Sequence, residues 1–509
     1  MQAQLIKQEA ERSLAEYSNH SATLSAKDVS SLSQRAVSLF FDFYQLTGSP
    51  LRAAVELLSE INASHNPTHA SLGLEALFPN LIEKLNDAFS PPYCTLYDRV
   101  FIQVISFLRR LPEGQRIDQA LNHFGMHNEA TLLRRKRNLK YRKTLLLPSR
   151  PLKKILFLSR VTIGADVAVT SVLMAHFKQR FPEAELVLIG SQKLHQLYGG
   201  DPQIRVAQID YGRSSTLLSR LETWLRVLDV IEGEFAGLNP EQYLVIDPDS
   251  RLTQLGLLPL LQKQSDDQSY LFFESRRFNH AEYHRLGQLA SHWIGNYCGE
   301  NRSSLPFVTL QPKDLAFGQQ VFSYLQNTEY CPVIFLSFGV GGNAIKRVSE
   351  QFEMKLVTAL SNRAKLIIDC GATPEEHEQV GKLLSILEAN GKTNASINNL
   401  QALSQLTNYK PDVLTWQGGL GTFASLIAGS NLYIGYDSAG QHIAAALLVP
   451  TLTIFVNSGS NIFPLRWHPH GSGRIKTIHL NASQTNGIES SDDAILSQVL
   501  SVQEQLLHP

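Results

Sequence analysis

The chain has 509 residues, of which 43% are apolar and 18% are charged, and its formal net charge is zero. This balance is typical of a folded globular protein and excludes a long disordered chain. The length predicts two or three domains, and the neutral charge gives no reason to expect a nucleic-acid partner.

The amino-terminal residues 1–17 are charged and predict a helix rather than a secretory signal. No apolar run is long enough, at about 18 residues, to predict a transmembrane span. The cysteines lack CxxC spacing, which argues against a disulfide framework or a zinc site; they are Cys94, Cys298, Cys331 and Cys370. We therefore expect a cytoplasmic protein without a zinc site.

Residues 1–145 are predicted to form an all-helical accessory domain. Apolar residues recur at helical spacing, between serine starts and Gly or Pro breaks, in the stretches 30–48, 49–62, 72–89 and 97–111. No catalytic pattern occurs in them. The segment is expected to pack on, or recognise, something else.

A basic run lies near the end of this segment, where seven of the ten residues from Arg134 to Lys143 are Lys or Arg. One reading is a patch for phosphate, an anionic membrane surface or nucleic acid. The other is the solvated face of a linker, which the neutral net charge favours. Contact with a protein or membrane surface stays open here, and no nucleic acid is expected.

Residues 146–320 alternate between predicted strands and helices. Strands are expected at 153–159, 185–191, 204–209, 243–249 and 270–275, with helices at 167–181 and 280–299. This alternation predicts a doubly wound, mostly parallel sheet.

A polar, proline-containing segment at 306–326 precedes a second alternating series over residues 321–509. Strands are expected at 332–338, 364–372, 412–416, 432–436 and 451–456, with helices at 348–361, 375–390, 421–430, 441–448 and 491–507. The fold class is therefore α/β, with two tandem Rossmann-like domains after the helical segment. A cleft between their carboxyl edges is the expected site.

Three loops are expected to face that cleft. In the first, 162–166, Gly164 permits a tight turn, and Asp166 either caps a helix or acts as a general base. In the second, 339–346, Gly339, Gly341 and Gly342 let backbone amides approach a ligand, and Lys346 adds a positive charge. Its spacing fits neither a Walker loop nor GxGxxG, and such a cluster can be a simple turn.

The third loop follows the buried strand at 432–436 and carries Asp437, Ser438 and His442. Ligands bind at the carboxyl edge of such sheets, and the exposed amides of a new helix favour an anion. The alternative is an ordinary βαβ unit in which Asp437 caps the helix.

Two further patterns favour structure over chemistry. Asp247-Pro248-Asp249 resembles a metal-binding DxD motif, but no His or Glu completes it, so a turn at a strand end is favoured. His468 and His470 have a spacing that could bind metal, but they lack partner ligands and are expected to lie in a returning loop.

Two stretches resemble the heptosyltransferase-like glycosyltransferases of family 9, and the likeness covers roughly residues 150 to 480. The first runs from Ile163-Gly164-Ala165-Asp166 to Phe181–Glu185, with Ala165 as an extra residue. The second is carried by Asp437-Ser438, His442, Ala444–Leu447, Pro450 and Phe455.

The resemblance implies a GT-B fold and an inverting, metal-independent transferase that needs no cofactor and uses a nucleotide-diphosphate sugar as donor substrate. Asp166 would match the base that deprotonates an acceptor hydroxyl on a saccharide or protein. Lys346 would match the lysine that neutralises the departing diphosphate. Donor contacts would come from Glu375 or Glu376, which match a ribose-binding carboxylate, and from Gly341, Gly342, Asn343, Asp437, Ser438, Gly440 and His442.

The sequence departs from the family pattern in both donor loops. Gly341 and Gly342 replace hydroxyl residues before the lysine, and Ala439 replaces the usual glycine after Asp437-Ser438. Alanine is costly at that place if the backbone needs a positive φ. A catalytically silent GT-B protein that binds nucleotide or glycan as a scaffold is therefore the alternative function.

Overall fold

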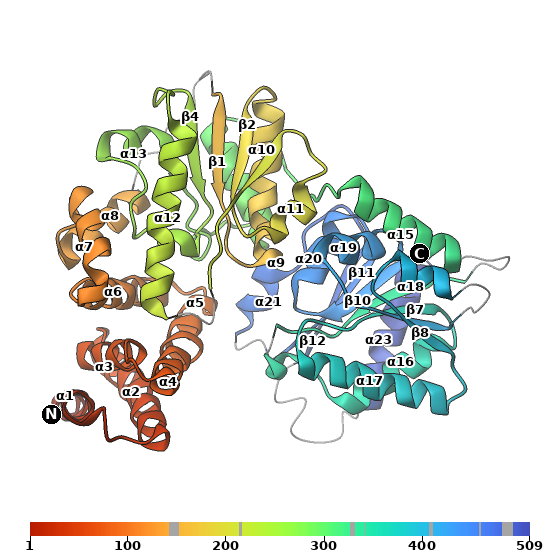
Figure 1. The fold of residues 1–509 in the computed structure, drawn as a ribbon, viewed down its shortest axis with the longest axis horizontal. Coiled ribbons are helices and arrows are strands. Elements are labelled where there is room, and N and C mark those ends of the chain that lie inside the picture. Colours follow the sequence, from red (N-terminus) through yellow and green to blue (C-terminus); the bar gives the residue numbers. More distant parts are fainter. Residues whose placement is uncertain are drawn as a thin grey trace. The chain divides into compact units, whose positions relative to one another are not determined.

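A computed structural model describes residues 1–141, 152–212, 216–325, 331–341, 343–406, 411–457, 460–480 and 492–508. The chain forms two compact units. One comprises residues 1–161, 187–191 and 207–279, and the other comprises residues 162–186, 192–206 and 280–509. Helices and parallel strands build both units (Figure 1).

The amino-terminal segment is helical, as predicted. Its helices are α1 (Gln2–His20), α2 (Ala26–Thr47), α3 (Arg52–Asn62), α4 (Pro67–Leu77), α5 (Lys84–Asp87), α6 (Pro91–Leu108), α7 (Gln115–His123) and α8 (Glu129–Tyr141), with a π-helical turn at Phe78–Glu83. Capping residues and prolines define the amino-terminal ends of several helices. Ser25 and Asp28 form a capping box before α2, and Pro91 opens α6 without needing an amide donor.

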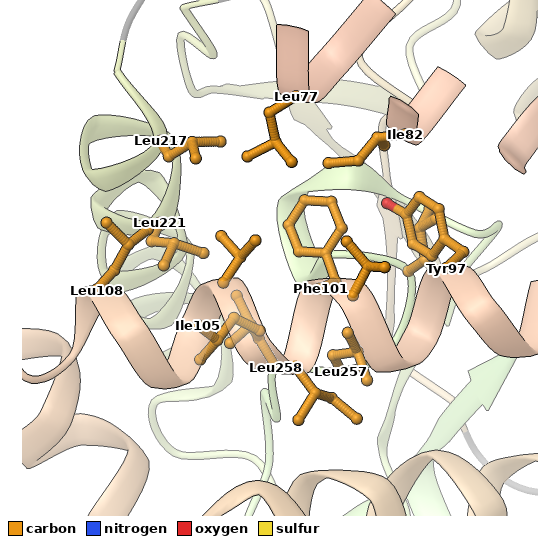
Figure 2. Close-up of a cluster of buried hydrophobic side chains, with 14 of the residues drawn as sticks. Leu77, Ile82, Tyr97, Phe101, Ile105, Leu108, Leu217, Leu221, Leu257 and Leu258 are labelled. Atoms are coloured by element: carbon orange, nitrogen blue, oxygen red, sulfur yellow. The ribbon is translucent and has the colours of Figure 1, made fainter. Parts of the chain in front are cut away.

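The core of this helical segment is continuous with that of the first sheet. Figure 2 shows Phe101 and Ile105 of α6 packed with Leu77 and with Leu221 of α12 (Leu217–Phe235). Strand residues such as Val245 belong to the same buried cluster. The segment is therefore an integral layer of the first unit, because its apolar faces are buried against the sheet domain.

The first sheet has the order β3-β2-β1-β4-β5. Its strands are β1 (Lys154–Leu158), β2 (Glu185–Gly190), β3 (Ile204–Gln208), β4 (Tyr243–Asp247) and β5 (Tyr270–Phe272). Most of these strands are continuous apolar runs, as expected where helices cover both faces. The pairs β1–β4 and β4–β5 are parallel, with Ile155 opposite Leu244 and Ile246 opposite Leu271. All five strands were predicted.

Other helices and short turns connect these strands. They are α9 (Ile163–Ala165), a π-helical segment at Asp166–Thr170, α10 (Ser171–Arg180), α11 (Lys193–Tyr198), α12, α13 (Lys263–Ser269) and α14 (Leu286–Cys298).

The second sheet is parallel throughout, with the order β12-β11-β10-β6-β7-β9-β8. Its strands are β6 (Val333–Ser337), β7 (Lys365–Asp369), β8 (Asn394–Ile397), β9 (Val413–Trp416), β10 (Leu432–Tyr436), β11 (Thr451–Val456) and β12 (Ile475–Leu480). The sequence predicted the five buried strands and missed the edge strands β8 and β12. Both edges carry polar residues that weaken the apolar signal. Two parallel α/β domains confirm the predicted GT-B class.

The helices of this second series are α15 (Pro312–Leu325), α16 (Glu350–Ser361), α17 (Pro374–Ala389), α18 (Leu400–Gln405), α19 (Leu420–Gly429), α20 (Ala439–Ala446), α21 (Ile462–Trp467) and α23 (Asp492–Leu507). The interpretation of residues 306–326 as a separating polar segment was wrong for most of its length. Gly318 of α15 packs against Ser425 of α19 so closely that a Cβ would lie 2.9 Å from the Ser425 carbonyl oxygen.

Both readings of the basic run at Arg134–Lys143 need correction, because two of its members point into the protein. Arg135 pairs with Asp266 at 3.1 Å, and Lys136 pairs with Glu274 at 3.1 Å while it lies over Phe272. Arg134, Arg137 and Lys140 are exposed on α8, and the last two basic residues, Arg142 and Lys143, lie outside the described residues. A buried ion pair cannot contribute to a surface patch.

No helix in the described ranges is long and apolar enough to cross a bilayer. All four cysteines are free thiols, and only Cys94 is fully buried. The cytoplasmic location stays a prediction.

Candidate active site

The strand orders place a topological switch point in each sheet. In the second sheet β7, β9 and β8 lie on one side of β6, and the chain then returns to β10 on the other side of β6. Ligands of open parallel sheets bind outside the carboxyl ends of strands at such a point. The loops that follow β6 and β10 are the predicted loops 339–346 and 437–442, so topology and sequence select the same place.

Asp437 joins these two loops through an ion pair. Its Oδ2 lies 2.6 Å from Lys346 Nζ, and its Oδ1 accepts a hydrogen bond of 2.8 Å from Gln441 Nε2. The N-cap of α20 is Ser438, which makes no side-chain capping bond. The alternative in which Asp437 merely caps the helix is therefore wrong. The Ser438 side chain accepts no hydrogen bond from the first amides of α20.

The replacement of the family glycine by Ala439 carries no backbone strain. Ala439 begins α20 and is not among the residues with positive φ. The next residue, Gly440, has the stricter requirement, because a Cβ there would collide with the Tyr433 hydroxyl. Ala439 therefore does not carry the predicted conformational cost, and the position that requires glycine is residue 440.

The loop after β6 is a tight turn that ends at Lys346. Gly341 has a φ of +64°, which favours glycine, and the amide of Asn343 donates to the Val340 carbonyl at 3.3 Å. Lys346 closes the short 3-10 turn Ala344–Lys346. Gly342 lies outside the described residues, so its predicted role is untested.

Asp166 lies within a helix rather than at its cap. Thr162 is the N-cap of α9, and Asp166 starts the π-helical segment that leads into α10. Its side chain is buried, at 1% exposure, and its Oδ1 accepts a 2.9 Å hydrogen bond from Thr170. An acceptor hydroxyl can reach this carboxylate only if neighbouring side chains move.

The short helix α9, which precedes Asp166, lies directly against the start of α20, within the same compact unit. A Cβ on Gly164 would be 3.2 Å from Ala439 Cα and 3.3 Å from His442 Cδ2. His442 is 4% exposed, and burial lowers its pKa to about 4 despite the nearby Asp437. His442 is therefore neutral at physiological pH and acts as a hydrogen-bonding side chain rather than a cation.

The predicted ribose-binding carboxylates have different environments. Glu376 completes a capping box with Thr373 and accepts a 2.8 Å bond from the amide of Ala372. It also lines a narrow pocket with Gly339, Asp369 and Gly371. Glu375 is exposed in the first turn of α17. Glu376 is therefore committed to the helix start, although it borders the candidate donor side.

Asp247-Pro248-Asp249 is a strand-end turn, as favoured. Asp247 ends β4 and accepts hydrogen bonds from Thr253 and from Tyr270 at 2.6 Å. Asp249 pairs with Arg276 at 3.1 Å. Both carboxylates are buried and already bonded, so the turn offers no open metal site.

His468 and His470 follow α21, in a loop as expected. His468 donates from Nδ1 to the Pro469 carbonyl at 2.8 Å. In the described part of the chain, no group of three or more His, Cys, Asp or Glu side chains gathers in a way that could hold a metal ion.

Sequence reasoning missed the residues that support the site. Thr170 donates a hydrogen bond to Asp166, and Gln441 donates one to Asp437. Each supporter lies four residues after its carboxylate, which is the spacing that brings side chains together on a helix. That spacing was visible in the sequence and is the signal that could have found them.

Asp369 offers a pH test of the pocket at the carboxyl end of β7. Burial raises the pKa of its carboxyl to about 6. The hydrogen bonds donated by the Ser337 hydroxyl and the Gly371 amide lower the pKa, but by less than burial raises it. The folded chain therefore holds a proton that the unfolded chain loses at lower pH. This group's contribution to stability falls as the pH rises from about 4 to about 6.

Replacing Asp369 with asparagine is expected to remove that fall. The melting temperature of the variant, relative to the natural chain, should rise between pH 4 and pH 7. His442, His468 and His470 have pKa values lowered to about 4, so their contribution changes in the opposite direction. They are common to both proteins and cancel in the difference. Parallel melting curves across this range would contradict the raised pKa.

Residues 391–490 match the family model of glycosyltransferase family 9 (heptosyltransferase). This segment is therefore similar to the family 9 glycosyltransferases. It contains the strands β8 to β12 and the Asp437 loop, and it confirms the resemblance predicted from the carboxyl-terminal motif. The family 9 match supports glycosyltransferase activity.

Three solved structures match this chain at low identity. A glycosyl transferase family 9 protein from Veillonella parvula is 17% identical, with a TM-score of 0.49 over 70% of this chain and 97% of its own. E. coli ADP-heptose LPS heptosyltransferase II is 15% identical, with a TM-score of 0.42 over 69% and 99%. E. coli heptosyltransferase WaaC with ADP is 13% identical, with a TM-score of 0.45 over 68% and 99%. A search of curated proteins finds no match.

Proposed function

We propose that the chain transfers a sugar from a nucleotide-diphosphate donor to a hydroxyl of a saccharide or protein, with inversion and without a metal. The observation that carries this proposal is the meeting of three loops at one place. Gly164 packs on Ala439 and His442, and Lys346 pairs with Asp437.

The donor diphosphate is proposed to lie at the amino-terminal end of α20. The amides there and the Lys346 ammonium supply positive potential for an anion, and Gly440 lets the backbone approach closely. On donor binding, Lys346 exchanges part of its contact with Asp437 for a phosphate oxygen. That charge stabilises the leaving diphosphate as its bond to the sugar breaks.

Asp166 is proposed to take the proton of the acceptor hydroxyl while the hydroxyl oxygen attacks the anomeric carbon. Because attack and departure occur on opposite faces, the configuration inverts. The proposed base, Asp166, and the cation, Lys346, belong to different segments that both approach the start of α20. One segment can therefore take the proton while the other stabilises the leaving group.

The test is release of nucleoside diphosphate from a panel of ADP-, UDP-, GDP- and dTDP-linked sugars, with and without a crude glycan extract as acceptor pool. We expect one donor to release its diphosphate faster when the extract is present. Absence of release from every donor in both arms would refute transfer.

The alternative function is a catalytically silent protein that binds a nucleotide or glycan. Two observations favour it: Asp166 is buried and bonded to Thr170, and Lys346 is already paired. Binding of a nucleoside diphosphate together with no turnover of any donor would support this alternative over the transferase.

Replacing Lys346 with alanine is expected to weaken nucleoside diphosphate binding by about tenfold to a hundredfold, because a charge-assisted contact to phosphate is lost. Calorimetry on the full-length chain measures the change. The matched control is Lys355→Ala, which removes a lysine paired with Asp493 on another surface and should leave affinity unchanged. Equal affinity in the Lys346→Ala variant and the natural chain would refute the phosphate role.

A further inference from the structure

Arg285 carries a charge that no acidic side chain compensates. It precedes α14, is partly buried, and makes no ion pair or side-chain hydrogen bond with any residue that the structure describes. Burial alone lowers its pKa, and no neighbouring carboxylate opposes that shift. A partly buried guanidinium without an anion is costly.

The charge of Arg285 acts on two histidines. His468 and His470 lie near enough for its charge to disfavour their protonation, after the larger effect of their own burial. Both are neutral at physiological pH. We define the Arg285 cluster as Arg285, His468 and His470.

His470 has two buried ring nitrogens, Nδ1 and Nε2, and neither has a hydrogen-bond partner within the described residues. A neutral imidazole can donate from one nitrogen and accept at the other. His468 has less to offer a ligand, because its Nδ1 already donates to the Pro469 carbonyl. Unsatisfied buried polar atoms are rare in folded proteins and call for an explanation.

The cluster lies beside the candidate active site. A Cβ on Gly287, two residues after Arg285, would be 2.9 Å from the carbonyl oxygen of Ala168 and 3.0 Å from His470 Cδ2. Ala168 belongs to the helical segment that begins with Asp166. On the other side, the ring of His442 lies 6.0 Å from that of Trp467, which directly precedes His468. No local motif indicates this arrangement, because α14 and the loop after α21 are far apart in the chain.

We propose that Arg285 and His470 form a subsite for an oxyanion, a phosphate or carboxylate group carried by one of the two substrates. The Arg285 fork fits such a group with two parallel hydrogen bonds, and one His470 nitrogen adds a donor. Because Arg285 is partly exposed, the oxyanion would enter the subsite past its side chain. The proposal rests on the transferase function proposed above, because it treats the anion as part of a substrate.

The test uses the full-length chain with inorganic phosphate as the probe, against chloride at equal ionic strength. We expect Arg285→Gln to weaken phosphate binding by about tenfold in calorimetry. Arg285→Lys should retain part of the affinity, because it keeps the charge without the fork. The matched control is Arg363→Gln, which changes an exposed arginine of the same unit and should bind as the natural chain does. Unchanged phosphate affinity in Arg285→Gln would overturn the proposal.

A second measurement needs no variant. Phenylglyoxal modifies accessible arginines of the natural chain, and mass spectrometry of its peptides reports each site. Phosphate should protect Arg285 and leave Arg363 as reactive as before. Equal modification of Arg285 with and without phosphate would also overturn the subsite.

A saturating nucleoside diphosphate separates the two sources of the anion. Continued phosphate binding assigns the subsite to a group on the acceptor, whereas competition assigns it to the donor diphosphate. If no nucleotide binds and no sugar is transferred, the proposed function fails. Loss of phosphate binding in Arg285→Gln would still show the subsite, so the two failures are distinguishable.

Discussion

Replacing Asp166 with asparagine is expected to reduce the rate of sugar transfer by about 10²–10⁴-fold, the usual contribution of a general base. Asparagine keeps the volume of the side chain and an oxygen that can accept from Thr170, so the fold should be retained. It lacks the negative charge needed to take a proton. Initial rates with the donor identified by the release assay measure the effect.

The affinity for nucleoside diphosphate distinguishes loss of the general base from a damaged donor site. The asparagine variant should bind nucleoside diphosphate as the natural chain does, because the proposed phosphate contacts come from Lys346 and α20. The matched control is Asp229→Asn, which changes an exposed carboxylate on α12 and should transfer sugar at the normal rate. Normal transfer by the Asp166 variant would exclude it as the base.

Replacing Leu77 with alanine is expected to lower the free energy of unfolding by about 2–5 kcal/mol, because a fully buried leucine leaves a cavity. Leu77 belongs to α4, yet it packs in the cluster that includes Leu257 and Leu258 of the sheet domain (Figure 2). Leu257→Ala should therefore affect the same unfolding transition. Denaturant melts followed by circular dichroism give both values.

The control for this pair is Leu46→Ala, the same change at a helical leucine that is 49% exposed. It should alter stability by no more than about 0.5 kcal/mol. If Leu77→Ala shifted an early transition and left a second one unchanged, the helical segment would be a separate domain. A single shifted transition supports one shared core.

Periodicity predicted most of the architecture because the burial of this fold is regular. The strands β1, β6, β10 and β11 are short apolar runs between turn residues, and each appears within a few residues of its expected place. What periodicity could not show is which polar residues turn inward. Arg135 and Lys136 read as part of a basic surface, but their partners Asp266 and Glu274 are more than a hundred residues away.

The site was predicted at the level of its loops rather than its contacts. Strand ends identified the loops at Asp166, Lys346 and Asp437, since parallel strands bring their carboxyl ends to one edge. The ion pair between Lys346 and Asp437 depends on a tertiary approach that no local pattern encodes. The same holds for Arg285, whose histidine neighbours come from a different part of the chain.

A crystal structure of the full-length chain with its nucleoside diphosphate bound tests the proposed donor site directly. We expect the diphosphate at the amino-terminal end of α20, within hydrogen-bonding distance of the Gly440 amide and Lys346 Nζ. A diphosphate bound elsewhere, with the Lys346–Asp437 pair unchanged, would contradict this expectation.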